Sequence, residues 1–179
     1  MPSRDPHLAA ARIVQDAGGE LVGRTRLQKI AFLTQLAGFG DEFAFEYRHY
    51  GPYSEELAQA MEIAVVLGPV VEEERVADWG GRYSIYTVAG SDNDSDQDRK
   101  NFIQEAKRID AVELELAATA AYFYVIEGIG DKVEGNPWEE TRRRKPSKAT
   151  GQRLDRAFRA YEELRKMKTL SPLPYISIG

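Results

Sequence analysis

One short stretch, residues 45–57 with the sequence FEYRHYGPYSEEL, constrains the fold more than any other part of this chain. Aromatic and polar residues alternate from Phe43 to His49, which is the two-residue period of a strand with one aromatic face. Gly51-Pro52 is expected to stop that strand, because proline has no N–H to donate to a ladder. Ser54 then has the side chain of a helix N-cap. The stretch therefore predicts a strand, a corner and a capped helix.

Apolar residues at helical spacing indicate further helices on both sides of this stretch. Before it, Thr25 and Gln28 have the spacing of a capping box at the start of a helix that runs to Gly38. After it, residues 70–76 and 82–88 have strand character, and two adjacent glycines predict a hairpin turn between them. The other helical patterns cover residues 8–17, 54–67, 99–126, 138–145 and 150–168.

This order of elements resembles a winged helix and predicts an α+β, mostly helical fold. We expect a winged-helix-like core with a β-hairpin in residues 1–90. A helical layer in residues 99–179 is expected to pack on the core as one unit. The hydrophilic stretch SDNDSDQD, residues 91–98, is expected to be an acidic linker between the two.

The net charge of −5 is unevenly spread along the chain. Residues 136–179 hold 11 Lys and Arg against 5 Asp and Glu, whereas the chain before residue 136 is acidic. The basic segment either braces the acidic body from within the molecule, which we favour, or binds an anionic partner. The candidate anion-binding residues are Arg142, Arg143, Arg144, Lys145, Lys148, Arg153 and Arg156.

Winged helices usually bind DNA through the helix that precedes the hairpin. Here that helix, residues 54–67, carries Glu55, Glu56 and Glu62 and has no Lys or Arg. Because phosphate attraction supplies most non-specific affinity, an acidic helix opposes this use. If the chain binds nucleic acid, we expect the basic C-terminal segment to make the contact.

The sequence contains no signature of a catalytic, cofactor or metal site. It has no cysteine, which excludes disulfides, thiolate nucleophiles and thiolate zinc sites. His7 and His49 have no neighbours at metal-ligand spacing, and we expect His49 to pack within the aromatic strand. Alternating aspartates between residues 91 and 98 lack the central glycine of a calcium loop, which favours a solvated linker with helix caps. We therefore expect no enzymatic activity, no cofactor and no metal.

The expected location of the protein is the cytoplasm. No run of the sequence is long and apolar enough to span a bilayer, so no membrane partner is expected. The N-terminus MPSRDPHLAA also lacks the apolar core of a signal peptide.

Three cations crowd the expected start of one helix, where the helix dipole disfavours positive charge. They either pair with nearby carboxylates such as Glu55 or Glu56, or they serve a function. In the second case they would join exposed members of the aromatic stretch in a patch that binds a protein partner. The candidate partner-binding residues are Arg24, Arg26, Lys29, Tyr47, Arg48, Tyr50 and Tyr53.

Three blocks of the sequence, in order, carry a family resemblance. GRTRLQKI (Gly23–Ile30) and FEYRHYGPYS (Phe45–Ser54), which ends in YGPYS, resemble the paired signature of the YwgA-like proteins and of the related SocA/Panacea group. LELAATA (Leu114–Ala120), followed by Arg144-Lys145-Pro146, is similar to later blocks of that group. The resemblance implies a small prokaryotic protein with no known catalytic activity. In the wider group some members act as antitoxins, and SocA is an adaptor that presents a toxin to a protease.

These observations predict a non-enzymatic protein-binding module, in the manner of a toxin-neutralising or adaptor factor. Its expected partner is a protein, such as a toxin or a client delivered to a protease. The alternative is a nucleic-acid-binding transcriptional regulator that uses the basic C-terminal segment.

Overall fold

A computed structural model describes residues 5–90 and 96–179, in which seven helices and two small antiparallel sheets confirm the α+β, mostly helical class. The helices are α1 (Pro6–Asp16), α2 (Arg24–Leu36), α3 (Glu55–Leu67), α4 (Gln97–Arg108), α5 (Ala111–Val125), α6 (Pro137–Arg144) and α7 (Arg153–Arg165). The strands are β1 (Glu20–Val22), β2 (Glu46–Arg48), β3 (Gly51–Tyr53), β4 (Val71–Val76) and β5 (Arg82–Thr87). Across the described residues no helix has the length and apolar character needed to cross a membrane.

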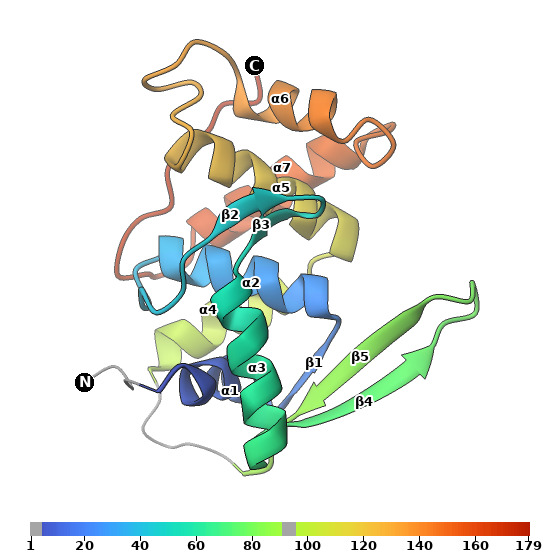
Figure 1. Cartoon of the computed structure of the whole chain (residues 1–179). Helices are drawn as coiled ribbons and strands as arrows, with labels where there is room; N and C mark the ends of the chain where they lie inside the picture. The colour runs from blue at the N-terminus through green and yellow to red at the C-terminus, as the bar shows by residue number, and fades with distance from the viewer. Residues whose placement is uncertain (1–4, 91–95) are drawn as a thin grey trace.

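The larger sheet has the strand order β1–β5–β4. The predicted hairpin of β4 and β5 is confirmed, and it projects from the body as an arm (Figure 1). Strand β1 was not predicted, because three residues between glycines are too few to show a period. Leu21 of β1 lies opposite Tyr86 of β5, and both are buried. The sheet is thus anchored at the base of the arm.

Helix α2 lies between the N-terminal elements and the C-terminal helices (Figure 1). It packs against α4 and α5, and its buried residues run without a gap from Leu27 to Thr34. Helices α1 and α3 pack on each other, and the small buried residues Ala10 and Ala64 belong to this pair. The predicted N-cap Ser54 and C-cap Gly68 of α3 are both confirmed.

The single helix predicted for residues 99–126 is wrong, because the chain forms α4 and α5 there with a break at Ile109. Ile109 has extended backbone, and the Asp110 side chain accepts hydrogen bonds from the N–H groups of Val112 and Glu113. The apolar pattern continues across the break since both helices bury apolar residues. Asp96 likewise caps α4, which confirms the predicted role of the acidic stretch at that position. Residues 91–95 of the predicted linker lie outside the described residues.

Helix α5 is the central element of the C-terminal half, buried on nearly all sides from Leu114 to Phe123. It contacts α2, α6, α7 and β3. The apolar C-terminal tail packs on the body: the Trp138 indole N–H donates to the carbonyl of Ile176, which is itself buried. These contacts hold α6 and the segment after it beside the N-terminal half.

Candidate functional site

The short hairpin β2–β3 lies over α5 and α2. Only Glu46–Arg48 forms the first strand, so the expected strand from Phe43 to His49 was too long. The corner Gly51-Pro52 was expected to end the sheet, and instead it lies in β3, with Pro52 opposite Tyr47. A two-stranded sheet tolerates this proline, since each strand has a free edge that needs no donor.

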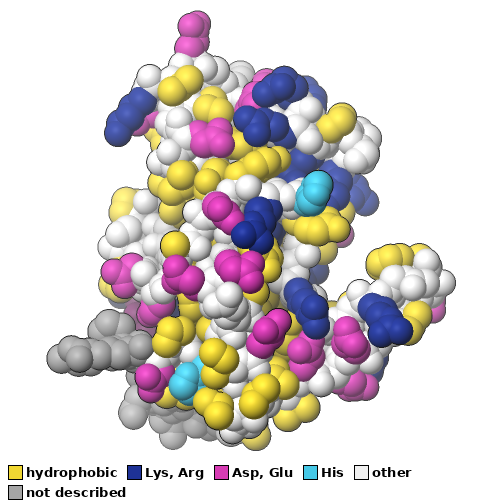
Figure 2. All heavy atoms as spheres, in the orientation of Figure 1, with side chains coloured by type: hydrophobic (Ala, Val, Ile, Leu, Met, Phe, Trp, Pro, Cys, Tyr) yellow, Lys and Arg dark blue, Asp and Glu magenta, His cyan; other side chains and the backbone are white. Residues whose placement is uncertain are grey.

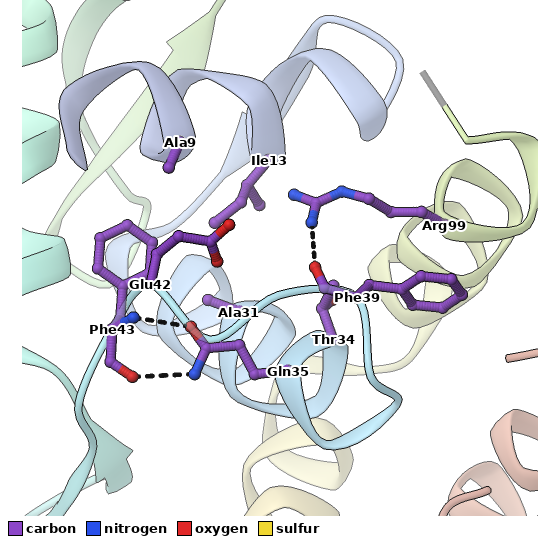
Figure 3. Close-up of a pocket in the computed structure, with 9 residues that line it drawn as sticks. All are labelled: Ala9, Ile13, Ala31, Thr34, Gln35, Phe39, Glu42, Phe43 and Arg99. Atoms are coloured by element: carbon purple, nitrogen blue, oxygen red, sulfur yellow. Dashed lines mark hydrogen bonds between the residues drawn. The ribbon is translucent and has the colours of Figure 1, made fainter. Parts of the chain in front are cut away.

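Two glutamines of α2 hold the two ends of the segment that contains this hairpin. Gln35 donates to the Phe43 carbonyl at 2.9 Å and accepts from the Phe43 N–H at 3.0 Å (Figure 3). Gln28 makes the same pair of bonds with Ser54, at 3.0 and 2.8 Å. The predicted capping box is therefore wrong: Gly23 is the N-cap of α2, and the Gln28 amide faces a distant loop instead of Thr25.

Lys29 holds the middle of the hairpin from beneath. Its side chain is buried, and Nζ donates to the Pro52 carbonyl at 2.7 Å. Burial lowers the pKa of Lys29 to about 7, an effect that Glu115 opposes and Lys145 reinforces. Lys29 is therefore not available to a partner at the surface, contrary to its place in the predicted patch.

Glu115 of α5 is the buried counter-charge of this cluster. The Lys148 ammonium donates to Glu115 Oε1 at 2.9 Å, and Lys145 Nζ lies 3.7 Å from Oε2. Lys145 also donates to the His49 carbonyl at 2.8 Å, and burial lowers the pKa of Lys145. One carboxylate thus faces Lys145 and Lys148 as well as Lys29, which its lowered pKa leaves only partly charged near pH 7.

Gly51 lets the hairpin approach α5 as closely as it does. Its φ of +92° favours glycine, and a Cβ there would lie 2.4 Å from Thr119 Oγ1. A methyl group at this position would push β3 away from α5. Gly51 is therefore required for the contact between the hairpin and the helix.

The aromatic side chains of the hairpin divide between an inner and an outer face. Tyr47 points inward, with its ring 5.3 Å from Phe123, and the Arg144 guanidinium lies 5.4 Å from the Tyr47 ring. Arg48 lies on the other face, 4.6 Å from the Tyr53 ring. The predicted patch of Tyr47, Arg48, Tyr50 and Tyr53 is thus split by the alternation of the strands.

The turn of the hairpin is exposed and flanked by cations. Tyr50 is 56% exposed, and Lys148 Nζ lies 4.6 Å from its ring. His49 is exposed too, so the expectation that it packs within the aromatic strand is wrong. The structure shows no cluster of metal-ligating side chains within residues 5–90 and 96–179. We call Arg48, His49, Tyr50, Tyr53 and Lys148 the hairpin surface.

The two remaining cations at the start of α2 reach partners outside the site. Arg24 pairs with Glu72 of β4 at 2.8 Å, and Arg26 donates to the carbonyls of Lys107 and Ile109 at the end of α4. The expected pairing with a nearby carboxylate is confirmed for Arg24, but with Glu72 instead of Glu55 or Glu56. Arg26 offsets its unfavourable position at the start of α2 by interacting with the negative end of α4.

Most of the basic C-terminal segment is paired within the molecule. Arg142 pairs with Glu139, while Arg143 and Arg144 pair with Glu140. Arg156 likewise pairs with Glu113 on α5, and Lys145 and Lys148 face Glu115. Of the seven predicted anion-binding residues, only Arg153 has no carboxylate partner within the part of the chain that the structure describes.

A small hollow is lined by α1, α2, the loop after α2 and Arg99 of α4 (Figure 3). Its volume of about 10 Å³ is the room of about one water molecule. Arg99 closes one side by donating to Asp16 Oδ2 at 2.7 Å and to the Phe39 carbonyl. The hollow is too small for a substrate and belongs to the packing of the loop.

The fold and the site define a mostly helical α+β protein whose surface hairpin is held down by buried lysines and glutamines. No protein-family model matches the chain. It is 29% identical over 168 residues to "Uncharacterized protein YwgA" of Bacillus subtilis (strain 168), a match that covers 90% of this chain and 97% of that protein. This relative supports the YwgA-like family predicted from the three sequence blocks. Residues from all three blocks contact one another at the hairpin. They are Gln28, Lys29, Gly51 to Ser54, Glu115, Thr119 and Lys145.

Proposed function

We propose that this protein is a protein-binding module without catalytic activity, and that its hairpin surface recognises an acidic segment of a partner. The proposal rests on one observation: aromatic and cationic side chains gather on a hairpin that the body holds in place, with Tyr50 and Arg48 exposed and Arg48 paired with Glu46 and Glu55. Tyr and Arg are the residue types enriched where protein interfaces gain most of their binding energy. A toxin-neutralising or adaptor role, which the Panacea resemblance implies, fits a module of this kind.

The fixed position of the hairpin also supports binding. Gln28, Lys29, Gln35 and Lys145 each hold a backbone carbonyl of residues 43–54. A loop that is ordered before it meets its partner loses less conformational entropy on binding. The excess of lysines over carboxylates beneath the hairpin favours a partner that brings negative charge.

The N-terminal elements fit a winged-helix-like core, as part of the same proposal. The order α1, β1, α2, α3, β4, β5 places β1 beside β5, with the arm in the position of a wing. The hairpin β2–β3 is then an insertion between α2 and α3. We take this likeness as one of topology, from which no DNA-binding function follows.

A comparison of two double variants tests the proposed site. Arg48→Ala/Tyr50→Ala removes exposed side chains of the hairpin surface while keeping Lys148, whose ammonium pairs with buried Glu115. Tyr175→Ala/Lys166→Ala removes an equally exposed tyrosine and cation at another place. In affinity capture from the native host, we expect one partner that the wild type and the second variant retain and the first variant loses.

The expected partner should also be released by added salt, because screening weakens attraction between exposed charges. A partner retained equally by both double variants would place the binding surface elsewhere. Turnover found in a broad substrate screen, and abolished by one point mutation, would overturn the non-enzymatic proposal.

The rival proposal is a nucleic-acid-binding regulator that uses the basic C-terminal segment. Unpaired Arg153 favours it, but the carboxylates beside the other cations leave little free charge for phosphates. Fluorescence anisotropy with a labelled duplex at low and physiological salt tests it, with Arg142→Ala/Arg143→Ala/Arg144→Ala as the variant. Tight binding that survives this variant but is lost in Gln59→Ala would place DNA on α3 instead.

A further inference from the structure

Helix α3 presents a second surface that the proposed function does not use. Ile63, Val66 and Leu67 are 48%, 84% and 63% exposed, at the spacing of one helix face. Val71, at the start of β4, follows them closely in the chain and is 62% exposed. Hydrophobic side chains gather over the C-terminal end of α3 in the space-filling view (Figure 2). Exposed apolar side chains that adjoin one another mark interaction sites more often than isolated ones do.

Carboxylates of α3 supply the free charge beside this apolar patch. Glu56 and Glu62 are exposed on α3 and have no ion-pair partner among the residues that the structure describes. Helix α3 has no Lys or Arg. The carboxylates of the neighbouring β4 are already paired, Glu73 with Arg75 and Glu74 with Arg24 and Arg82. The helix therefore combines an apolar end with unpaired carboxylates. A phosphate backbone is repelled by such a surface, while Lys and Arg are attracted to it.

We propose that this α3 surface, made of Glu56, Glu62, Ile63, Val66, Leu67 and Val71, docks a cationic amphipathic segment of a partner protein. An apolar stripe on the incoming segment covers Ile63, Val66 and Leu67, and its Lys or Arg side chains pair with Glu56 and Glu62. We expect the partner segment to be a helix, because the apolar residues of a helix repeat with the spacing of the α3 patch. Its apolar residues lie at the end of α3 away from the hairpin surface, and its charge preference is the opposite one.

The probe is a synthetic peptide of roughly 14 residues in which leucines at helical spacing alternate with lysines. A second peptide keeps the leucines and replaces each lysine by glutamate. Fluorescence anisotropy against the full chain is expected to show binding of the Leu/Lys peptide only. Binding should fall as salt rises, because the attraction between exposed charges is screened.

Matched variants locate the contact. Val66→Asp is expected to weaken binding of the Leu/Lys peptide about tenfold or more, because it removes one well-packed contact. Val76→Asp, at an equally apolar and 67% exposed position on the arm, should leave it unchanged. Glu62→Lys should weaken binding several-fold, and Glu134→Lys, which changes the net charge equally, should not.

The outcomes that would contradict docking of a cationic segment at the α3 surface are the following. Equal binding of both peptides, or equal weakening by Val66→Asp and Val76→Asp, would overturn it, as would no binding at all. Self-association of the chain that Val66→Asp abolishes, without peptide binding, would assign the surface to a second copy instead. Tyr50→Ala alone should not change peptide binding, so failure of the hairpin proposal and failure of this one are separate results. Arg48 is kept in this control because it pairs with Glu55, beside Glu56.

Discussion

The two hairpins of this protein are both antiparallel strand pairs, but they differ in how much the rest of the molecule contacts them. The hairpin β2–β3 has three residues in each strand, yet Gly51 and Pro52 are buried and side chains from α2 and from the segment after α6 hold its backbone. The arm has six residues in each strand, and every residue of β4 except Glu72 is exposed. Its side-chain contacts are mainly ion pairs between exposed groups, such as Arg75 with Glu73.

This difference shows that strand length does not decide how firmly a hairpin is fixed. An isolated two-stranded hairpin is marginally stable in water, whatever its length. The short hairpin gains its fixed geometry from side chains distant in sequence, and the arm has such support only at its base. We therefore expect substitutions in β2–β3 to change the stability of the whole protein, and those in the arm to have small effects.

The largest expected effect is that of Gly51→Ala. A Cβ at residue 51 would lie 2.4 Å from Thr119 Oγ1, and φ is also unfavourable for alanine. We expect a loss of more than about 3 kcal/mol in the free energy of unfolding, measured by urea denaturation.

Gly80→Ala in the turn of the arm is the matched control. Its φ of +89° is similar, but a Cβ there meets nothing within 4 Å. It should cost only about 1 kcal/mol, the penalty of the backbone conformation. Equal losses in the two variants would contradict the claim that contact with α5 holds the short hairpin.

A pH dependence of intermediate size should come from Lys29. Because burial lowers its pKa in the folded state to about 7, the unfolded chain binds more protons between pH 7 and the ordinary lysine pKa of 10.5. The free energy of unfolding should therefore rise with pH in that window, by up to about 1.4 kcal/mol per pH unit for one group. Lys29→Met should flatten this rise, as measured by urea denaturation at several pH values.

The same measurement on Lys166→Met provides the control, because that side chain is exposed on α7. Its pH profile should match that of the wild type. Lys145 contributes in the same direction as Lys29, since burial lowers its pKa too, so a smaller slope should persist in Lys29→Met. An unchanged slope in Lys29→Met would show that the lysine under the hairpin is not desolvated.

The smallest effect is expected from Trp79→Ala in the turn of the arm. The Trp79 ring is 80% exposed, so its removal should change the free energy of unfolding by less than about 0.5 kcal/mol. Trp138→Ala, which removes a fully buried ring, should cost about 3–5 kcal/mol. Circular dichroism during denaturation measures both without relying on tryptophan fluorescence. A large loss from Trp79→Ala would mean that the arm is integral to the core.

The sequence by itself determined those features that depend on neighbouring residues. Ser54 and Gly68 bound α3, the glycines of the arm turn join β4 to β5, and Asp96 caps α4, all through contacts within a few residues. The helical content also follows from local periodicity. The blocks that predicted a YwgA-like protein are equally local, and they needed no structure to be read.

Only the tertiary structure decided which residues form the hairpin site. Gln28 has the spacing of a capping box, but its amide pairs with Ser54, 26 residues away. Lys29 looks like a surface cation, but its ammonium is buried under Pro52, and Lys145 reaches His49 across 96 residues. A glutamine or lysine side chain can bond to any carbonyl within reach. The sequence shows that such a group is present, and only the packing of α2, α5 and α6 determines which carbonyl it meets.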